Sequence, residues 1–345
     1  MPAIRKVIAM QVMFTTMMLA ILGTMCCWGA EVVRAQEPLE EVVAAIDRGL
    51  EYLYRIQESD GGWSSPGYGK NVAITSLATL AFLARGHVPG RGPYSECLER
   101  ATQFLCSMSQ PGGALYAPTP APPMYQHGLG TLALAELYGM TRRRDVKEKL
   151  EAAVDLIVRC QNDQGGWRYQ PQKADADLSV TVMQLVALKG AMNAGIKVPQ
   201  ATVEKGILYV RACAHPGGGF AYQPGGGPAI PVSAAGTISM QVCGAYEAPE
   251  VKRGLDYLAK APLSYGGQFF FYAIYYTAQA MNQAGGAYYD DWMNSARSLI
   301  LSKQQPDGGW PAGSSHEANA GTAYSTAMAL LVLEVDCHYL PIYQR

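Results

Sequence analysis

The sequence predicts an all-α protein in which six helical hairpins form one closed ring, an (α/α)6 toroid. Three observations support this fold: a repeated turn motif, an amphipathic stretch before each turn and an apolar stretch after it. The motif is a pair of glycines, in most copies with an aromatic residue close behind, and its second glycine falls at positions 62, 113, 166, 219, 267 and 309. Self-similarity at steps of this size is the mark of a repeat architecture.

The stretch before each turn has the pattern of a surface helix. In the first copy, apolar residues recur every three or four positions from Leu39 to Leu53, and charged residues occupy the positions between them. Such a pattern buries one face of a helix and leaves the other in water. The glycines that follow supply the left-handed backbone that ends a helix without a steric penalty. We therefore expect six outer helices.

The stretch after each turn is apolar on nearly all sides and rich in small residues. A helix that is hydrophobic all round must be enclosed, so these segments are expected to form an inner ring. Asn71, Asp177 and Thr322 stand near the starts of inner helices and are expected to cap them at one mouth of the ring. Clear examples of inner helices are residues 75–81, 129–135, 180–188 and 322–333.

The first 35 residues have the organisation of an export signal. Arg5 and Lys6 precede an apolar run that carries no charge before Glu31, and Val33-Arg34-Ala35 places small residues three and one before a cut. We predict cleavage after Ala35 and a single toroid over residues 36–345. The uncharged run is also long enough to span a bilayer, so an uncleaved membrane anchor is the alternative.

Composition excludes several classes of function. The formal net charge is −1 and the basic runs are no longer than Arg142-Arg143-Arg144, so the charge pattern of a nucleic-acid-binding protein is absent. The six cysteines beyond residue 35 are expected to be buried free thiols, because a core of this size does not need disulfides. We expect no cofactor and no metal, since the adjacent residues Asp336-Cys337-His338 cannot converge on one ion.

Three copies of the turn resemble a known repeat. The segments 57–63, 161–167 and 305–310 are similar to the QW repeats of the squalene-hopene cyclase, oxidosqualene cyclase and protein prenyltransferase superfamily. The resemblance extends from Leu39 to about Leu333 and implies the same α/α toroid. It also implies a scaffold role, in which the glutamine and tryptophan tie an outer helix end to the next turn, for Gln57, Trp63, Gln161, Trp167 and Trp310.

The third copy is followed by an acid pair. Asp175-Ala176-Asp177-Leu178 resembles the Asp-x-Asp-Asp motif of protonation-initiated (class II) terpene cyclases, which implies that Asp177 is the proton donor and Asp175 its neighbour. Protonating an alkene needs a protonated acid, and a carboxyl beside another carboxylate in an apolar cavity has a raised pKa. Leu178 stands where the family has its final aspartate. The alternative is structural: Asp177 caps the third inner helix and Asp175 is solvated.

Aromatic residues open the fifth inner helix. Tyr272, Tyr275 and Tyr276, with Gln279, recur at helical spacing and are expected to share a face that binds an apolar ligand or stabilises a carbocation. Core packing is the alternative for this cluster. At the start of the second inner helix, Tyr125 is expected to contact the ligand, and His127 to approach Asp177 or to act as a capping group. His316 and Glu317 occupy the corresponding turn of the sixth copy and are expected to join the same rim.

These residues predict an exported, terpene-cyclase-like toroid whose lumen binds an apolar, isoprenoid-like molecule, with acid-initiated cyclisation or isomerisation as its reaction. Two alternatives stay open: a non-catalytic binding toroid that has lost the acid motif, and a polysaccharide-processing (α/α)6 enzyme. The expected partner is an apolar small molecule or isoprenoid lipid. A peripheral membrane contact also stays open, and the residues point to no particular protein partner.

Overall fold

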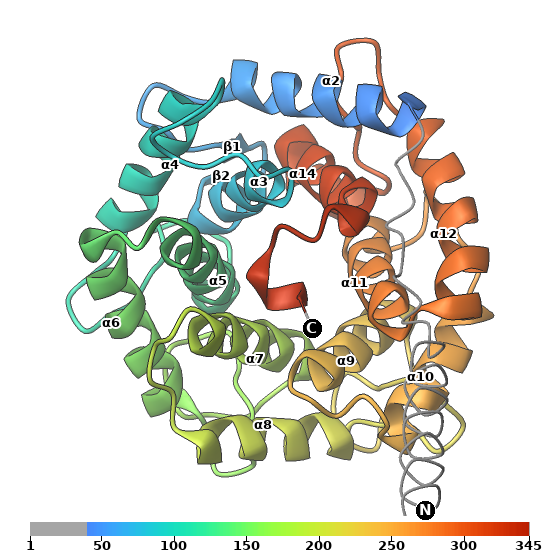
Figure 1. The fold of residues 1–345 in the computed structure, drawn as a ribbon. Helices are drawn as coiled ribbons and strands as arrows, with labels where there is room; N and C mark the ends of the chain where they lie inside the picture. The colour runs from blue at the N-terminus through green and yellow to red at the C-terminus, as the bar shows by residue number, and fades with distance from the viewer. Residues whose placement is uncertain (1–39, 345) are drawn as a thin grey trace, which may run out of the picture. The chain divides into compact units, whose positions relative to one another are not determined.

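The computed structural model describes residues 40–344, and the expected export signal at residues 1–35 lies outside them. Within this range, an inner and an outer ring of helices alternate along the chain (Figure 1). The outer helices are α2 (Glu40–Ile56), α4 (Ser95–Ser107), α6 (Arg144–Cys160), α8 (Gln200–Ala212), α10 (Pro249–Ala259) and α12 (Gly286–Leu301). The inner helices are α3 (Val72–Ala84), α5 (Pro123–Thr141), α7 (Leu178–Asn193), α9 (Ile230–Val242), α11 (Phe270–Ala284) and α14 (Gly321–Leu333).

The ring closes on itself, which confirms the predicted toroid. Each inner helix packs against the next, and α14 packs against both α3 and α2. Shorter elements complete the described chain: the hairpin of β1 (Ser64–Ser65) and β2 (Gly69–Lys70), the helix α13 (Ser315–Ala318), and the 3-10 turns η1 (Val335–Cys337) and η2 (Pro341–Tyr343). None of the helices in residues 40–344 is long and apolar enough to cross a membrane.

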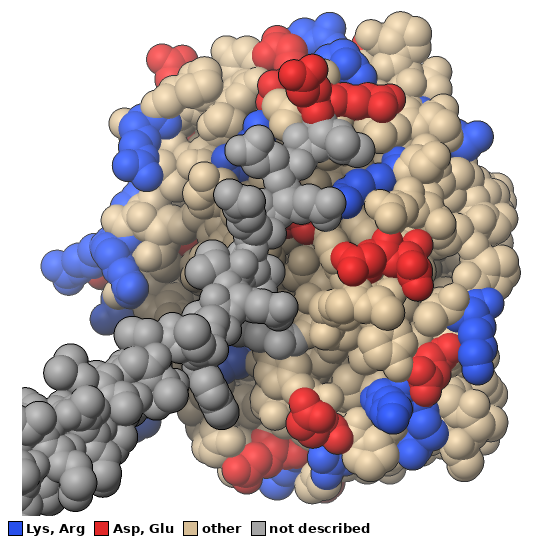
Figure 2. All heavy atoms as spheres, turned by 45° about the vertical axis from the view of Figure 1, so that its right-hand side comes forward, with Lys and Arg blue, Asp and Glu red and all other residues tan. Residues whose placement is uncertain are grey.

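Burial follows the two predicted hydrophobic patterns. In α2 the buried residues form one stripe that includes Ile46, Leu50 and Leu53, whereas in α3 every residue except Ala73 is buried. The six cysteines of the described chain are free thiols, as expected; Cys97, Cys160 and Cys213 are also buried, whereas Cys106, Cys243 and Cys337 are half-buried. On the face shown in Figure 2, acidic and basic side chains are interspersed among uncharged ones.

In five of the six copies the glycine turn docks its hairpin onto the next outer helix. Gly61, Gly113, Gly165, Gly218 and Gly308 all have left-handed backbone, with φ between +88° and +103°. A Cβ on Gly165 would lie 2.2 Å from the carbonyl oxygen of Lys205 in α8, and one on Gly308 would lie 2.3 Å from that of Arg48 in α2. Only glycine permits so close an approach. In the second copy the glycine that approaches the next outer helix is Gly113. It is the second glycine of its own pair but takes the place that the first glycine has in Gly61-Gly62 and Gly165-Gly166.

The glutamine and tryptophan side chains reinforce this docking. Gln161 donates from Nε2 to the carbonyls of Gly165 and Thr202, at 2.8 Å each, and Trp167 donates from Nε1 to that of Ile157 at 2.8 Å. Gln57 and Trp63 make the corresponding bonds in the first copy. We call this set of contacts between a turn and its two neighbouring outer helices a joint.

In the sixth copy the glutamine of the joint is Gln304, one position earlier than the sequence comparison placed it. Gln304 donates from Nε2 to the carbonyls of Gly308 (2.9 Å) and Ala45 (2.8 Å). Gln305 instead donates to the carbonyl of Lys303 and is exposed. Because Ala45 belongs to α2, the sixth joint connects the end of the chain to its first helix.

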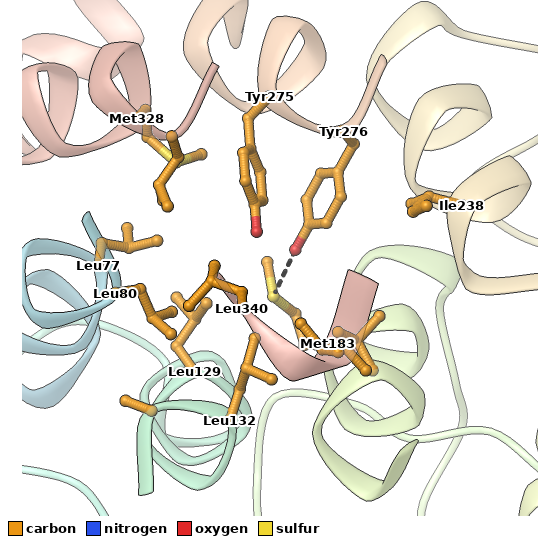
Figure 3. Close-up of a cluster of buried hydrophobic side chains, with 14 of the residues drawn as sticks. Leu77, Leu80, Leu129, Leu132, Met183, Ile238, Tyr275, Tyr276, Met328 and Leu340 are labelled. Atoms are coloured by element: carbon orange, nitrogen blue, oxygen red, sulfur yellow. Dashed lines mark hydrogen bonds between the residues drawn. The ribbon is translucent and has the colours of Figure 1, made fainter. Parts of the chain in front are cut away.

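Side chains fill the centre of the ring at the level shown in Figure 3, where an open lumen was expected. Leu340 from the C-terminal segment lies among residues of the inner helices, which include Leu77, Leu132 and Met183. Leu340, Ile342 and Tyr343 are at most 7% exposed. Figure 1 shows the C-terminus inside the ring, so residues 334–344 occupy one end of the enclosure.

Candidate ligand site at the mouth of the ring

Asp177 is the N-cap of α7, as the structural reading of this residue predicted. Its Oδ1 accepts hydrogen bonds from the backbone N–H of Val180 (3.0 Å) and from the hydroxyl of Ser179 (2.6 Å). The side chain is fully buried, and its Oδ2 has no hydrogen-bond partner. The expectation that Thr322 caps α14 was wrong. Thr322 lies inside the helix, and its hydroxyl accepts a hydrogen bond from the hydroxyl of Tyr52 at 2.7 Å.

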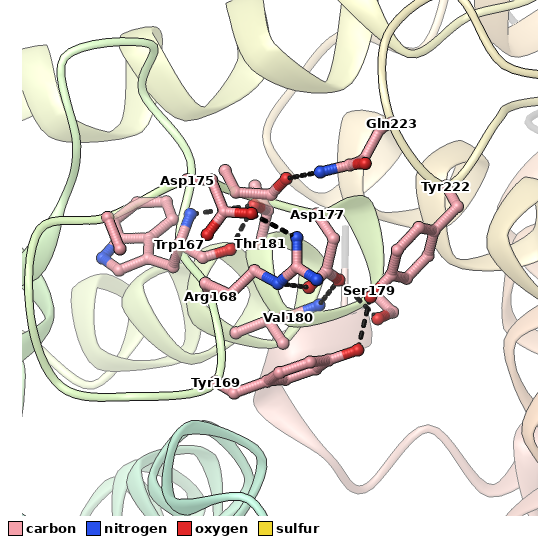
Figure 4. A network of polar contacts seen from close by, with 12 residues as sticks. Trp167, Arg168, Tyr169, Asp175, Asp177, Ser179, Val180, Thr181, Tyr222 and Gln223 are labelled. Atoms are coloured by element: carbon pink, nitrogen blue, oxygen red, sulfur yellow. Dashed lines mark hydrogen bonds and ion pairs between the residues drawn. The ribbon is translucent and has the colours of Figure 1, made fainter.

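A guanidinium separates the two aspartates (Figure 4). Arg168 contacts Asp175 Oδ2 through Nη1 at 2.6 Å and lies 3.6 Å from Asp177 Oδ2 through Nε. Asp175 itself is exposed. The expectation was two carboxyl groups acting on each other in an apolar cavity, but in the structure the Arg168 guanidinium lies between them.

Two tyrosines stack on this arginine. The guanidinium carbon lies 4.9 Å from the ring centre of Tyr169 and 5.9 Å from that of Tyr222, within the range of cation–π attraction. The hydroxyls of the two tyrosines hydrogen-bond to each other. Gln223, the next residue, donates to the carbonyl of Ala176 at 2.8 Å. Neighbouring repeats thus hold Arg168 in one position.

Tyrosines from two inner helices, α5 and α11, lie close to Asp177. Tyr125 of α5 hydrogen-bonds to Ser179 of α7 at 2.6 Å, and the rings of Tyr272 and Tyr276 in α11 are 4.8 Å apart. Burial raises the pKa of Tyr272 well above its ordinary value, and the nearby Tyr276, Tyr125 and Asp177 raise it further. These phenols therefore stay protonated and act as hydrogen-bond donors. The Tyr272 hydroxyl has no partner.

Glu317 completes this group from the sixth copy. It is 3% exposed, and its Oε1 accepts from the backbone N–H of Phe271 at 2.7 Å, so it caps α11. Burial raises the pKa of Glu317 to about 7, although hydrogen bonds from the backbone of α11 and from Tyr324 oppose the shift. Its Oε2 makes no hydrogen bond of good geometry. We define the mouth cluster as Tyr125, Asp177, Tyr272, Glu317 and Tyr324.

His127 does not contact Asp177. Its Nδ1 accepts from the backbone N–H of Leu115 at 3.1 Å, so its Nε2 carries the proton and donates to the carbonyl of Ala153 at 3.1 Å. Threonines occupy this position in other copies: Thr181 accepts from the N–H of Trp167 at 3.0 Å, and Thr75 from that of Trp63 at 3.1 Å. His127 is thus part of the second joint.

The remaining predicted ligand residues divide between different places. The hydroxyl of Tyr275 bonds to that of Tyr343 at 2.7 Å, and Gln279 lines a cavity of about 10 Å³ beside Leu340, so both face the C-terminal segment. Tyr276 points to the centre of the ring, where its hydroxyl donates to the sulfur of Met183 at 3.1 Å. His316 is exposed and stacks on Phe269, at 5.5 Å between ring centres.

Comparison with known proteins identifies the family. A family model described as the prenyltransferase alpha-alpha toroid domain matches residues 127–342. The chain belongs to this family. A search of curated proteins finds no match.

Solved structures with the same fold catalyse different reactions. A cellobiose 2-epimerase from Spirochaeta thermophila superposes with a TM-score of 0.67 at 16% identity, covering 86% of this chain and 96% of the other. An inactive α-1,6-mannanase of Salegentibacter, solved with α-1,6-mannotriose, gives 0.64 at 11% identity, with coverage of 86% and 99%. A type II terpene cyclase of Scytonema, MstE, solved as a variant with its substrate geranylgeranyl dihydroxybenzoate, gives 0.62 at 12% identity, with coverage of 87% and 99%. At these identities the likeness shows the fold alone.

Proposed function

We propose that this protein is a binding toroid that holds an apolar, isoprenoid-type molecule by an oxygen-bearing end at the mouth cluster. The observation that carries this proposal is a set of three buried oxygens that make no hydrogen bond: the hydroxyl of Tyr272, Oε2 of Glu317, and Oδ2 of Asp177, which lies 3.6 Å from Arg168 Nε. Leaving such a group unpaired costs roughly 1–3 kcal/mol. Three of them at one mouth favour a ligand that completes their hydrogen bonds.

The chemistry of the cluster selects the polar end of the ligand. Tyr272 is a donor, and Glu317, with a pKa of about 7, can donate when protonated and accept when ionised. A hydroxyl or carbonyl group satisfies both residues. The rest of the ligand meets tyrosine faces and the apolar side chains of α11, which favours a hydrocarbon body. The terpene-cyclase neighbour, whose bound substrate carries a geranylgeranyl group, supports the isoprenoid class.

Binding is favoured over acid-initiated cyclisation by two features. Arg168 lies against Asp177, and the centre of the ring holds Leu340 and the surrounding inner-helix side chains. A cyclase needs a protonated acid at the end of a cavity that folds its substrate. Proton donation by Asp177 is therefore treated as an alternative outcome of the test.

The test measures binding of farnesol and geranylgeraniol to the purified full-length protein by isothermal titration calorimetry. Tyr272→Phe should weaken binding by about tenfold because it removes one hydrogen bond, and Glu317→Gln should weaken it because a neutral amide replaces a group that can make a charge-assisted hydrogen bond. Tyr54→Phe, on an exposed tyrosine of α2, is the matched control and should bind like the wild type. Equal affinity for all four proteins contradicts the proposal. Cyclic products that vanish with Asp177→Asn would show catalysis, and binding of cellobiose in place of prenols would favour carbohydrate.

We also propose that the protein is exported, on the basis of the charge and hydropathy pattern of its first 35 residues. Expression with a C-terminal tag, followed by fractionation and N-terminal sequencing, tests this. A mature chain beginning at Gln36 outside the cytoplasm is expected. The intact N-terminus in the membrane fraction would indicate an anchor, and an intact soluble cytoplasmic chain would contradict export.

A further inference from the structure

The fifth copy of the repeat departs from the others at its aromatic residue. The N–H of Gly267 donates to the carbonyl of Ser264 at 2.9 Å, as the N–H of Gly61 does to that of Glu58 at 2.9 Å. This shared turn aligns the copies residue by residue. Phe269 follows Gly267 by the same interval at which Trp63 follows Gly61, and it is therefore the fifth counterpart of Trp63, Trp167 and Trp310.

The other aromatic counterparts are buried, whereas Phe269 is not. Trp63, Trp167, Phe220 and Trp310 are at most 1% exposed, and Phe269 is 44% exposed. Its backbone has φ +56°, which is uncommon for any residue other than glycine. Its ring leans on His316 at the surface.

A missing loop explains the outward position of Phe269. In the other copies several residues separate the aromatic from its inner helix, for example between Trp63 and the start of α3 at Val72. In the fifth copy α11 begins at Phe270, directly after Phe269. No residues remain between Phe269 and α11 in which the chain could turn the phenyl ring toward the core. Gly267 also lacks the left-handed backbone of the other docked glycines, and a Cβ on it would meet Ser264 of its own turn and no residue of α12.

A cavity of about 490 Å³ lies beside this incomplete joint. Its walls include Leu258 of α10, Ile274 of α11 and Trp292 of α12, with Val232 of α9. In the first copy Trp63 likewise contacts the outer helix before it, at Leu53, and the inner helix after it, at Phe82. A second cavity of about 590 Å³ shares Trp292 and lies between the same turn and α12. The gap left by the missing joint is therefore open and mostly apolar.

We propose that the fifth joint is a second binding site, which takes an apolar molecule carrying a planar ring. The ring class follows from the repeat itself, because an indole fills the equivalent position in three other copies. Cavities enclosed by apolar side chains bind small aromatic guests without a polar anchor, and the volume is that of a ligand pocket. Phe269 at the rim offers a ring face to the part of the ligand that extends outward. None of the five residues of the mouth cluster lines this cavity, although Tyr222, which stacks on Arg168, does.

Photolabelling of the full-length wild-type protein with 3-trifluoromethyl-3-phenyldiazirine, an apolar aromatic probe, tests the proposal without any substitution. We expect incorporation, mapped by peptide mass spectrometry, to concentrate in residues 258–277 and at Trp292, and indole to suppress it saturably. Incorporation spread over the surface, or unaffected by indole, would overturn the proposal.

A blocking variant gives a second measurement. Ala261→Trp places an indole at the half-buried turn residue that borders both cavities, and it should lower labelling of the site at least tenfold. Leu208→Trp adds the same side chain at an exposed position on α8 and should leave labelling unchanged. Circular dichroism melts verify that both variants fold, and Ala273→Phe replaces Ala261→Trp if that variant does not. Undiminished labelling in a folded blocking variant contradicts the site. Prenol binding at the mouth cluster should be the same in Ala261→Trp and Leu208→Trp.

Discussion

Replacing His127 with threonine should flatten the dependence of stability on pH. His127 is fully enclosed between Leu115 and Ala153 in the second joint, and burial lowers its pKa to about 4, while a hydrogen bond to Ala153 partly opposes the shift. Threonine does the same work in three other copies, where Thr75, Thr181 and Thr326 accept the equivalent backbone N–H. The substitution His127→Thr therefore keeps the acceptor and removes the titrating group.

The magnitude follows from proton linkage. The pKa of His127 in the folded state lies below its ordinary value of 6.5, so the unfolded chain binds the proton more readily. The contribution of His127 to stability is complete above the unfolded pKa and is lost as pH falls toward the folded one. Between pH 7 and pH 4.5 this loss amounts to about 2–3 kcal/mol, at 1.36 kcal/mol per pH unit.

Urea unfolding of both proteins at pH 7, 6, 5 and 4.5 measures this difference. All carboxylates titrate in both proteins, so the change in the difference of their unfolding free energies isolates His127. We expect the wild type to lose about 2–3 kcal/mol more than His127→Thr over this range. Parallel curves would show that His127 titrates normally in the folded state, which would refute its enclosure in the joint.

Three further substitutions test other parts of the ring. Gln304→Ala should lower the free energy of unfolding by about 1–3 kcal/mol, because it removes two hydrogen bonds to backbone carbonyls. The neighbouring exposed Gln305→Ala should change the free energy of unfolding by less than about 0.5 kcal/mol. The reverse order in urea titrations would refute the assignment of the sixth joint. Burial raises the pKa of Glu136 to about 8, so the contribution of Glu136 to wild-type stability is lost as pH rises from about 4.5 to 8. The free energy of unfolding of Glu136→Gln should therefore rise relative to that of the wild type by about 1.4 kcal/mol per pH unit in that window. A difference between the two proteins that does not change with pH would count against a buried carboxyl. Ending the chain at His338 removes the buried Leu340, Ile342 and Tyr343. Each side chain contributes about 1.5–3 kcal/mol of burial free energy, so the urea midpoint of unfolding should fall. An unchanged midpoint would mean that this segment does not fill the ring.

The repeat made the fold predictable from the sequence. Each copy carries its own signals, since the amphipathic stretch, the glycine turn and the enclosed helix recur with local spacing, and a ring follows once every inner helix must be covered. The first copy shows this well: Ile46, Leu50 and Leu53 of the predicted apolar stripe lie on the buried face of α2, and Asn71 caps α3 as expected. The sixth joint was misread by one residue because Gln304 and Gln305 are adjacent and equally plausible in the sequence.

The candidate site was harder to predict because it depends on contacts between copies. Asp175 and Asp177 were visible as a pair, but nothing local shows that Arg168 enters between them, or that Tyr222 from the next copy stacks on that arginine. Glu317 was assigned to the rim without a partner, and its role as the cap of α11 follows only from the path of the sixth loop. The C-terminal segment had no repeat signal at all, yet it determines what fills the ring.

Both candidate sites lie where a copy of the repeat departs from the common pattern. In the third copy a charged and aromatic insertion follows a complete joint, so Trp167 and Gln161 hold the backbone that presents Arg168 and Asp177. In the fifth copy the joint itself is incomplete, and the position of the missing aromatic side chain is open. Because contacts in a repeat ring are made mainly between neighbours, such a departure costs the stability of one joint and leaves the closure of α14 on α2 and α3 intact. A toroid of this kind can therefore acquire a binding site by losing a residue that fills a joint, as well as by gaining a residue that can contact a ligand. Sequence patterns indicate the gained residue but not the space that a lost residue leaves.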